Sequence, residues 1–194
     1  ELFAGVRRDF GRVDILVNNA GYTHRNEPML DVPEAVFDRV FAVNVKAIYL
    51  AALASVPMFR DQGEGLILNT ASTAGLRPRP GLTWYNASKG AVITMTKSMA
   101  AELAPDRIRV NCICPVAGET GMLADFMGGD AHKVIATRSN AIGRIEIEGE
   151  SGTERDVAVQ GNIIAGNQTE RFALSTGGTD EGVVVVGVVG VEGV

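Results

Sequence analysis

Cysteine and histidine are scarce in this chain of 194 residues, which contains two of each. Two cysteines are too few for a disulfide-stabilised secreted scaffold. Cys112 and Cys114 lie two residues apart in a segment that alternates like a strand, so both sulfurs are expected on one face. The alternative, a zinc site, lacks ligands, because the sequence has neither a second cysteine pair nor a histidine at ligand spacing. We interpret both cysteines as reduced structural thiols and expect no metal site.

Positive charge and long apolar runs are also in short supply. Lysine and arginine total 18 against 23 acidic residues, so the net charge is −5 and no sequence-wide positive field attracts nucleic acid. The longest apolar stretch, between Gly182 and Val191, is shorter than the roughly 18 residues that cross a bilayer. The first residues do not have the basic-then-apolar pattern of a secretory signal. We expect a cytoplasmic protein that binds neither nucleic acid nor membrane.

Hydrophobic residues make up 46% of the chain and charged residues 21%, which is typical of one compact globular domain and excludes a disordered chain. The hydrophobic periodicity predicts strands that alternate with helices. This alternation indicates parallel pairing through right-handed crossovers in an open α/β sheet, whose ligands bind beyond the carboxyl ends of the strands. The expected strands are residues 13–18, 65–70, 108–114 and 182–191, and the expected helices are residues 1–10, 31–59, 83–104 and 154–165.

The second of these helices has a start signal and a polar residue on its inward face. Asp31 and Glu34 have the spacing of a capping box, and Pro33 is tolerated in the first turn. The apolar residues that follow recur every three or four positions, and Asn44 falls on the same stripe. We expect a long helix from this start, with Asn44 facing inward.

Several polar residues converge on one edge of the predicted sheet. Tyr85 and Lys89 are four apart on a helix and share one face. Ser72 lies thirteen residues before Tyr85 at the end of a strand, and residues 18–21, Asn-Asn-Ala-Gly, follow another strand. Each feature alone has an ordinary explanation, such as a surface pair, a turn serine or a satisfied buried amide. Together with Asn44 they predict a catalytic rim.

The order and spacing of these residues resemble the short-chain dehydrogenase/reductase family, and in particular its 3-oxoacyl-carrier-protein-reductase-like branch. The match is dense from about Val13 to Gly128, so we expect one domain, residues 1–194, in which residues 1–128 are strongly family-like and residues 129–194 are divergent. The resemblance implies a doubly wound, mostly parallel, Rossmann-like sheet. The motifs that carry it are Asn18-Asn19-Ala20-Gly21, Asn44, Ser72, Tyr85-Asn86-Ala87-Ser88-Lys89 and the segment that begins at Pro115.

The same resemblance implies an oxidoreductase that transfers hydride between NAD or NADP and a small-molecule carbonyl/alcohol substrate. Tyr85 would be the acid/base, Lys89 would stabilise its phenolate and hold the nicotinamide ribose, and Ser72 would stabilise the substrate oxygen. Asn44 would hold a water that links Lys89 to solvent. A tyrosine pKa of about 10 would then have to fall by roughly 3 units, or about 4 kcal/mol.

The resemblance also assigns a cofactor cleft. Val116 stands where most family members have glycine, which narrows the backbone options there without removing the pocket. The family often forms homotetramers, so we expect a homo-oligomer. The implied cofactor-binding residues are Asn19, Ala20, Gly21, Tyr85, Lys89, Pro115, Val116, Gly118 and Thr120.

The sequence departs from the family pattern in one respect, because it contains no glycine-rich phosphate-binding turn. That turn and the residue that selects the cofactor belong to the first two β-α units, so we expect a partial sequence that lacks them, and NAD and NADP both stay open. A non-catalytic binding or assembly protein with a degenerate cofactor site is the alternative from another class. A sugar or polyol substrate is an alternative within the enzyme class.

Two further features have two interpretations each. The basic loop Arg77-Pro78-Arg79-Pro80 follows Ser72, and it either meets an anionic carrier or phosphate on the substrate or lies at a subunit contact or in solvent. Trp84, the only tryptophan, either walls the substrate pocket or packs between helices.

Overall fold

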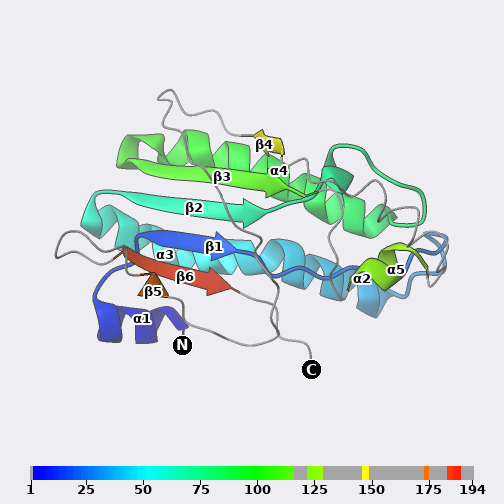
Figure 1. Cartoon of the computed structure of the whole chain (residues 1–194), viewed down its shortest axis with the longest axis horizontal. Helices are drawn as coiled ribbons and strands as arrows, with labels where there is room; N and C mark the ends of the chain where they lie inside the picture. The colour runs from blue at the N-terminus through cyan, green and yellow to red at the C-terminus, as the bar shows by residue number, and fades with distance from the viewer. Residues whose placement is uncertain (1, 116–121, 129–145, 149–172, 175–182, 189–194) are drawn as a thin grey trace.

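The protein folds around a mostly parallel sheet with the strand order β4-β3-β2-β1-β6-β5 (Figure 1). The computed structural model describes residues 2–115, 122–128, 146–148, 173–174 and 183–188. The strands are β1 (Ile15–Asn18), β2 (Gly65–Thr70), β3 (Ile108–Cys114), β4 (Glu146–Glu148), β5 (Ala173–Leu174) and β6 (Val183–Val188). The α-helices are α1 (Leu2–Phe10), α2 (Glu34–Phe41), α3 (Ala47–Gln62), α4 (Thr83–Leu103) and α5 (Leu123–Phe126), and shorter turns are η1 (Ala42–Lys46), η2 (Thr73–Gly75) and η3 (Ala104–Asp106).

Strand pairing confirms the predicted α/β class. β1 pairs in parallel with both β2 and β6, and β2 pairs in parallel with β3. The short strands β4 and β5 are antiparallel to their neighbours. All four predicted strands are present, and the predicted helix 154–165 lies outside the described residues.

The long helices α3 and α4 lie behind the sheet in Figure 1, and the main core fills the space between these layers. Phe59 of α3 packs in one cluster with Leu16 of β1 and Ile67 of β2, and all three are fully buried. Val6 of α1 and Leu103 of α4 join the same cluster. Burying each such side chain stabilises the fold by about 1.5–3 kcal/mol, so the strand ends rest on a well-packed layer.

Two helix ends follow their sequence signals. α1 ends at Phe10 and is followed by Gly11, whose φ of 72° is the left-handed conformation that closes a helix. α4 ends at Leu103, and Pro105 lies in the 3-10 turn that follows.

The start of α2 differs from the prediction. Pro33 occupies the cap position and makes no side-chain capping bond, while Asp31 donates its backbone N–H to the carbonyl of Pro28 at 2.9 Å in a preceding turn. The predicted capping box of Asp31 and Glu34 is therefore wrong, because the cap residue itself must supply the side-chain acceptor.

α2 and α3 are joined by a turn of π-helix, η1, so that the helical run is continuous from Glu34 to Gln62. π-turns are rare and are frequently found at functional sites. Asn44 lies in this turn and is 1% exposed, as expected for the inward stripe.

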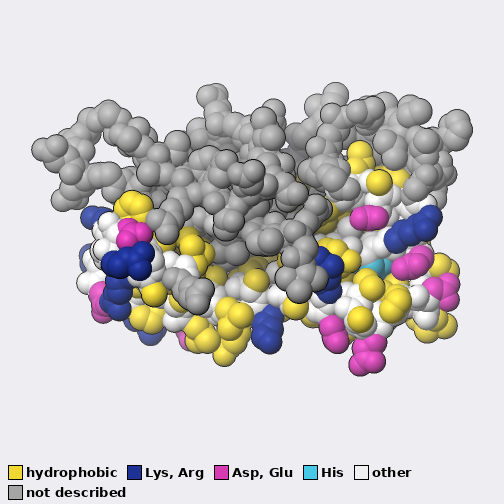
Figure 2. Space-filling view, turned by 90° about the horizontal axis from the view of Figure 1, so that it is seen from below, with side chains coloured by type: hydrophobic (Ala, Val, Ile, Leu, Met, Phe, Trp, Pro, Cys, Tyr) yellow, Lys and Arg dark blue, Asp and Glu magenta, His cyan; other side chains and the backbone are white. Residues whose placement is uncertain are grey.

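The run Glu34–Gln62 has 29 residues and a mean hydropathy of 1.6, and by length and composition alone it could cross a membrane. The core helix of a soluble protein meets the same criterion. Only 28% of the apolar window is buried, and its exposed apolar side chains include Tyr49, Leu50 and Leu53. Figure 2 shows hydrophobic side chains along the lower edge of the molecule, away from the grey residues. The same run also places Ile48 and Phe59 in the core.

Candidate active site

Buried amides join the carboxyl ends of β1 and β2 to α4. Asn18 and Asn69 are partners in the strand register, and Asn18 Nδ2 donates to Asn69 Oδ1 at 2.8 Å. Asn69 Nδ2 donates in turn to Oγ1 of Thr96 on α4 at 2.9 Å. Buried, fully bonded polar chains of this kind specify one geometry. The sheet edge and α4 are therefore held in a fixed relation.

Tyr85 and Ser72 meet at this edge. Tyr85 lies in the first turn of α4 and is 4% exposed, and Ser72 follows β2 and is 7% exposed. The Tyr85 hydroxyl is hydrogen-bonded to the Ser72 side chain. The Ser72 Oγ also accepts the Ala74 N–H at 3.1 Å, and Phe126 meets the Tyr85 ring edge-on at 5.1 Å between centroids. Both hydroxyls are thus positioned by the protein itself.

Lys89 lies one turn along α4 and is 3% exposed. Its Nζ donates to the carbonyl oxygen of Thr70, the last residue of β2, at 2.7 Å, and lies 5.9 Å from the centroid of the Tyr85 ring. The missing side chain of Gly21 leaves room beside it, because a Cβ there would lie 3.7 Å from Nζ. The ammonium therefore faces the segment that follows β1.

The pKa values of the pair depart from the expectation. Burial raises the pKa of Tyr85 to about 12, with the Ser72 hydrogen bond acting in the opposite direction. Burial also lowers the pKa of Lys89 to about 8. The expectation that Lys89 brings the Tyr85 pKa toward 7 is wrong for the protein alone, because loss of water around the phenolate outweighs a cation that lies against the ring face.

Asn44 links the π-turn to both sides of the site. Its Oδ1 accepts the Tyr22 N–H at 2.8 Å, and its Nδ2 donates to the Tyr22 carbonyl at 2.9 Å and to Ser88 Oγ at 2.8 Å. Ser88 Oγ donates to the carbonyl of Tyr85 at 2.7 Å. Both amide hydrogens of Asn44 are therefore used to hold the segment after β1 against the turn that carries Tyr85 and Lys89.

The remaining cofactor residues divide into two groups. Asn19 Oδ1 accepts the Thr70 hydroxyl at 3.1 Å, which places it beside β2. The Pro115 carbonyl accepts both the N–H and the hydroxyl of Thr73, at 3.1 and 3.3 Å, which places it beside the Ser72 turn. Ala20 lies between Asn19 and Gly21 at the end of β1. The expected positions Val116, Gly118 and Thr120 lie outside the described residues.

Three polar residues that support the site were given no role from the sequence: Ser88, Asn69 and Thr96. The sequence does contain a signal for Ser88 and Thr96. Both lie at three- or four-residue spacing from residues on the inward face of α4, which are Tyr85, Lys89 and Val92. Asn69 falls inside an apolar strand pattern, which gives no sign of its partners.

The two cysteines and the tryptophan lie in packed parts of the fold. Cys112 and Cys114 are buried and form no disulfide within the described residues, a part of the chain that also holds no cluster of metal-ligating side chains. The Trp84 ring packs edge-on against Phe37 of α2 at 5.3 Å, and its Nε1 donates to the carbonyl of Met29 at 3.2 Å. Of its two interpretations, Trp84 packs between helices.

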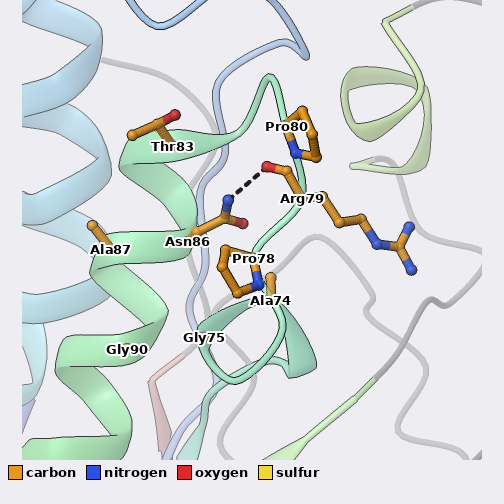
Figure 3. Close-up of a pocket in the computed structure, with 9 residues that line it drawn as sticks. All are labelled: Ala74, Gly75, Pro78, Arg79, Pro80, Thr83, Asn86, Ala87 and Gly90. Atoms are coloured by element: carbon orange, nitrogen blue, oxygen red, sulfur yellow. Dashed lines mark hydrogen bonds between the residues drawn. The ribbon is translucent and has the colours of Figure 1, made fainter.

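Two hollows adjoin the basic loop after Ser72. A cavity of about 30 Å³ lies at the Tyr85 side, and its lining includes Ser72, Arg79, Leu82, Tyr85, Phe126 and Met127. A larger open hollow of about 450 Å³ lies between the loop and α4, and Pro78, Arg79 and Asn86 are among the residues that line it. The Arg79 side chain extends away from α4 (Figure 3). The smaller cavity is the one that both Ser72 and Tyr85 line.

The sequence profile of the family described as short chain dehydrogenase matches residues 1–129. The chain belongs to the short-chain dehydrogenase family. The resemblance stated from the sequence is thereby confirmed, and the site just described is where this family member gathers its motif residues.

The matches to individual relatives cover different shares of this short-chain dehydrogenase-family chain. It is 53% identical over 118 residues to the 4-formylbenzenesulfonate dehydrogenase TsaC1/TsaC2 of Comamonas testosteroni, a match that covers 61% of this chain and 47% of that protein. It is 35% identical over 185 residues to the 3-oxoacyl-[acyl-carrier-protein] reductase FabG of Thermotoga maritima, covering 95% of this chain and 72% of that protein. The chain thus spans about half the length of the first relative.

A solved structure shares the fold. The 3-ketoacyl-(acyl-carrier-protein) reductase from Brucella melitensis, complexed with NADH, superposes with a TM-score of 0.62 and is 48% identical. The match covers 64% of this chain and 52% of that one. The Rossmann-like α/β class of the short-chain dehydrogenase family therefore holds for the described fold.

Proposed function

We propose that this protein transfers hydride between NAD or NADP and a carbonyl/alcohol substrate, with Tyr85 as the acid/base. The observation that carries the proposal is the buried contact of the Tyr85 hydroxyl with Ser72, with Lys89 on the next turn of the same helix. A proton donor and a second hydroxyl at one point can bind a single carbonyl oxygen from two sides. This arrangement suits a reaction in which negative charge develops on that oxygen.

Each residue of the site has a role that follows from its surroundings. With a pKa of about 12, Tyr85 is a neutral phenol near pH 7 and can donate its proton to a substrate oxygen. Ser72, oriented by η2, would hydrogen-bond the same oxygen. Lys89 provides the buried positive charge that stabilises the phenolate left behind, and Asn44 holds the turn that carries both residues.

The residues at the end of β1 suit a nicotinamide dinucleotide. When bound, the nicotinamide would supply or accept the hydride. Gly21 leaves open space beside the Lys89 ammonium and the Asn44 amide, which a side chain would fill. Asn19, Gly21, Lys89 and Pro115 would hold the cofactor there. The similar Brucella melitensis reductase, which is complexed with NADH, supports a nicotinamide dinucleotide as the ligand.

The Tyr85→Phe variant tests the proposal in the full protein. We expect turnover to fall by about 10²–10⁴-fold, because general acid–base catalysis contributes on that order, while dinucleotide binding is kept. The matched control is Tyr49→Phe, which removes a hydroxyl from the outer face of α3 while keeping the aromatic ring there, and it should leave turnover unchanged. Turnover is followed by NADH or NADPH absorbance, and undiminished activity of Tyr85→Phe would refute the role.

A dinucleotide titration separates this proposal from a non-catalytic binding or assembly protein. An oxidoreductase should show a rise in melting temperature with NADH or NADPH, because a ligand that binds only the folded state stabilises it. No shift with either dinucleotide at millimolar concentration would favour the non-catalytic alternative.

A further inference from the structure

One charged residue stands among the described residues that line the small cavity at Tyr85. Ser72, Leu82 and Tyr85 are buried residues of its lining, whereas Arg79 is an exposed one. The cavity of about 30 Å³ holds little more than one water-sized group. On the proposed function, the reacting carbonyl occupies this space and the rest of the substrate extends past Arg79.

The backbone of Arg79 is tied to the helical turn that carries the acid/base. Asn86, the residue after Tyr85, is 7% exposed and its Nδ2 donates to the Arg79 carbonyl at 2.8 Å (Figure 3). Pro78 and Pro80 flank the arginine, and each restricts the backbone to a φ near −65°. The root of the side chain is therefore fixed relative to Tyr85.

Two further bonds hold the far end of this loop. Asn26 Nδ2 donates to the Pro80 carbonyl at 3.2 Å, and the Glu27 N–H donates to the Gly81 carbonyl at 3.0 Å. A loop fixed at three carbonyls presents its side chain with little loss of backbone entropy on binding. An exposed arginine held in this way differs from one on a free surface loop.

The guanidinium of Arg79 has no carboxylate within ion-pair distance among residues 2–115 and 122–128, whereas Arg7, Arg12 and Arg60 each pair with an aspartate. Figure 3 shows the Arg79 side chain directed away from α4. We propose that Arg79 binds an anionic group of the substrate, so that the substrate class is a carbonyl or alcohol that bears a carboxylate, sulfonate or phosphate. Arginine binds such planar or tetrahedral oxyanions through two parallel hydrogen bonds. This inference rests on the proposed function and specifies its substrate.

Matched aldehydes test the proposal. The anionic probes are 4-carboxybenzaldehyde and 4-formylbenzenesulfonate, and the neutral probe of similar shape is 4-methylbenzaldehyde. Wild-type protein should have at least tenfold higher kcat/KM for the anionic probes. Arg79→Ala should lower that value roughly 10- to 100-fold, mainly by raising KM, and should leave the neutral probe unchanged. Arg79→Lys, which keeps the charge but not the paired hydrogen bonds, should recover part of the loss.

Arg77→Ala is the matched control, because Arg77 is also exposed in the same loop but does not line the cavity. It should leave all three probes unchanged. Equal turnover of neutral and anionic probes by the wild type, or an equal loss for both in Arg79→Ala, would overturn this inference while leaving the proposed function intact, since an aldehyde is still reduced. Failure to reduce any probe would overturn it as well, and the dinucleotide titration then decides separately whether the proposed function survives.

Discussion

Lys89 places a positive charge inside the fold at a cost to stability. Its folded pKa of about 8 is below the ordinary value of 10.5 because burial penalises the ammonium. Between these two values the unfolded chain binds more protons than the folded one, so stability rises with pH across this window. The penalty is complete below pH 8 and absent above about 10.5.

A Lys89→Met variant measures this penalty. The free energy of unfolding of wild type, relative to the variant, should rise by about 3 kcal/mol as the pH increases from 7 to 11. Urea denaturation of both proteins at each pH gives the difference directly. Parallel pH profiles would contradict a buried charge at this position.

The convergence of the candidate catalytic residues on one edge could be predicted from the sequence, but their energetics could not. The four-residue spacing of Tyr85 and Lys89 and the strand-end position of Ser72 place them at one edge in any parallel α/β sheet. The direction of the Tyr85 pKa shift depends on how completely the phenol is enclosed, and Phe126, 41 residues later in the chain, helps to enclose it. The spacing of residues along the sequence does not show that Phe126 packs against Tyr85.

The contact between η2 and α4 depends on a glycine. A Cβ at Gly75 would lie 2.7 Å from the backbone nitrogen of Gly90 and the carbonyl carbon of Lys89, and backbone atoms cannot yield as a side chain can. The turn that follows Ser72 is thereby allowed to rest directly on the helical segment that carries Lys89.

We expect Gly75→Ala to destabilise the protein by about 1–3 kcal/mol, as overpacking does, and to lower turnover because η2 moves away from α4. Gly90→Ala adds a methyl group on the α4 side of the same contact. Its Cβ would meet only the Gly75 oxygen at 3.7 Å, and alanine favours the helix by up to about 1 kcal/mol, so this variant should be neutral or more stable. Thermal unfolding and steady-state kinetics of the pair measure both effects. Equal behaviour of the two variants would argue against the close approach.

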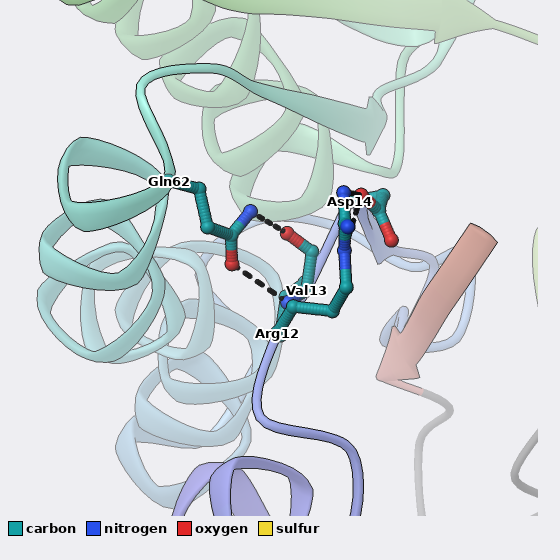
Figure 4. Close-up of polar contacts among 4 residues, drawn as sticks. All are labelled: Arg12, Val13, Asp14 and Gln62. Atoms are coloured by element: carbon teal, nitrogen blue, oxygen red, sulfur yellow. Dashed lines mark hydrogen bonds and ion pairs between the residues drawn. The ribbon is translucent and has the colours of Figure 1, made fainter. Parts of the chain in front are cut away.

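Sequence patterns do not predict the side-chain contacts that join elements far apart in the chain. The side-chain amide of Gln62, the last residue of α3, accepts the Val13 N–H at 2.9 Å and donates to the Val13 carbonyl at 2.6 Å (Figure 4). Arg12 and Asp14 on either side form an ion pair. Nothing in the periodicity of either segment indicates this clamp, because 49 residues separate its partners.

The outer face of α3 bears on the assembly of the whole molecule. Tyr49, Leu50 and Leu53 are 55%, 52% and 58% exposed and share one side of the helix. Contiguous apolar surface of this kind is typical of protein interfaces. We propose that this face joins protomers in the expected homo-oligomer.

A Leu53→Glu substitution tests that assembly. Light scattering after size exclusion should give a multiple of the protomer mass for wild type and a lower mass for Leu53→Glu, because burying an unpaired carboxylate at an interface is costly. Leu30→Glu, which alters an 86% exposed leucine in the turn before α2, should leave the mass unchanged. A wild type that already runs as a monomer would contradict the proposal.

The architecture as a whole was the most predictable property of the chain. Buried parallel strands read as short apolar runs, and β1, β2 and β3 each do so between helices with clear ends. The π-turn at Asn44 was not predictable, because the apolar pattern continues through it without a break. The strands β4 and β5 also have no distinct sequence signal, since three-residue and two-residue strands are shorter than any periodicity.

The pairing of Asn18 with Asn69 has a consequence for how the chain finds its alignment. The strands of this sheet are almost uniformly apolar. If β1 were shifted by one position against β2, apolar side chains would still be buried, so hydrophobic burial discriminates weakly between the shifted and the native register. The two carboxamides do discriminate, since a slip would break the bond between them and take from the buried Asn18 Nδ2 and Asn69 Oδ1 the partners they have in the native alignment. The amide pair therefore favours a single register of β1 against β2. That register fixes where the end of β2 lies, and with it the Thr70 carbonyl that accepts a hydrogen bond from the Lys89 ammonium.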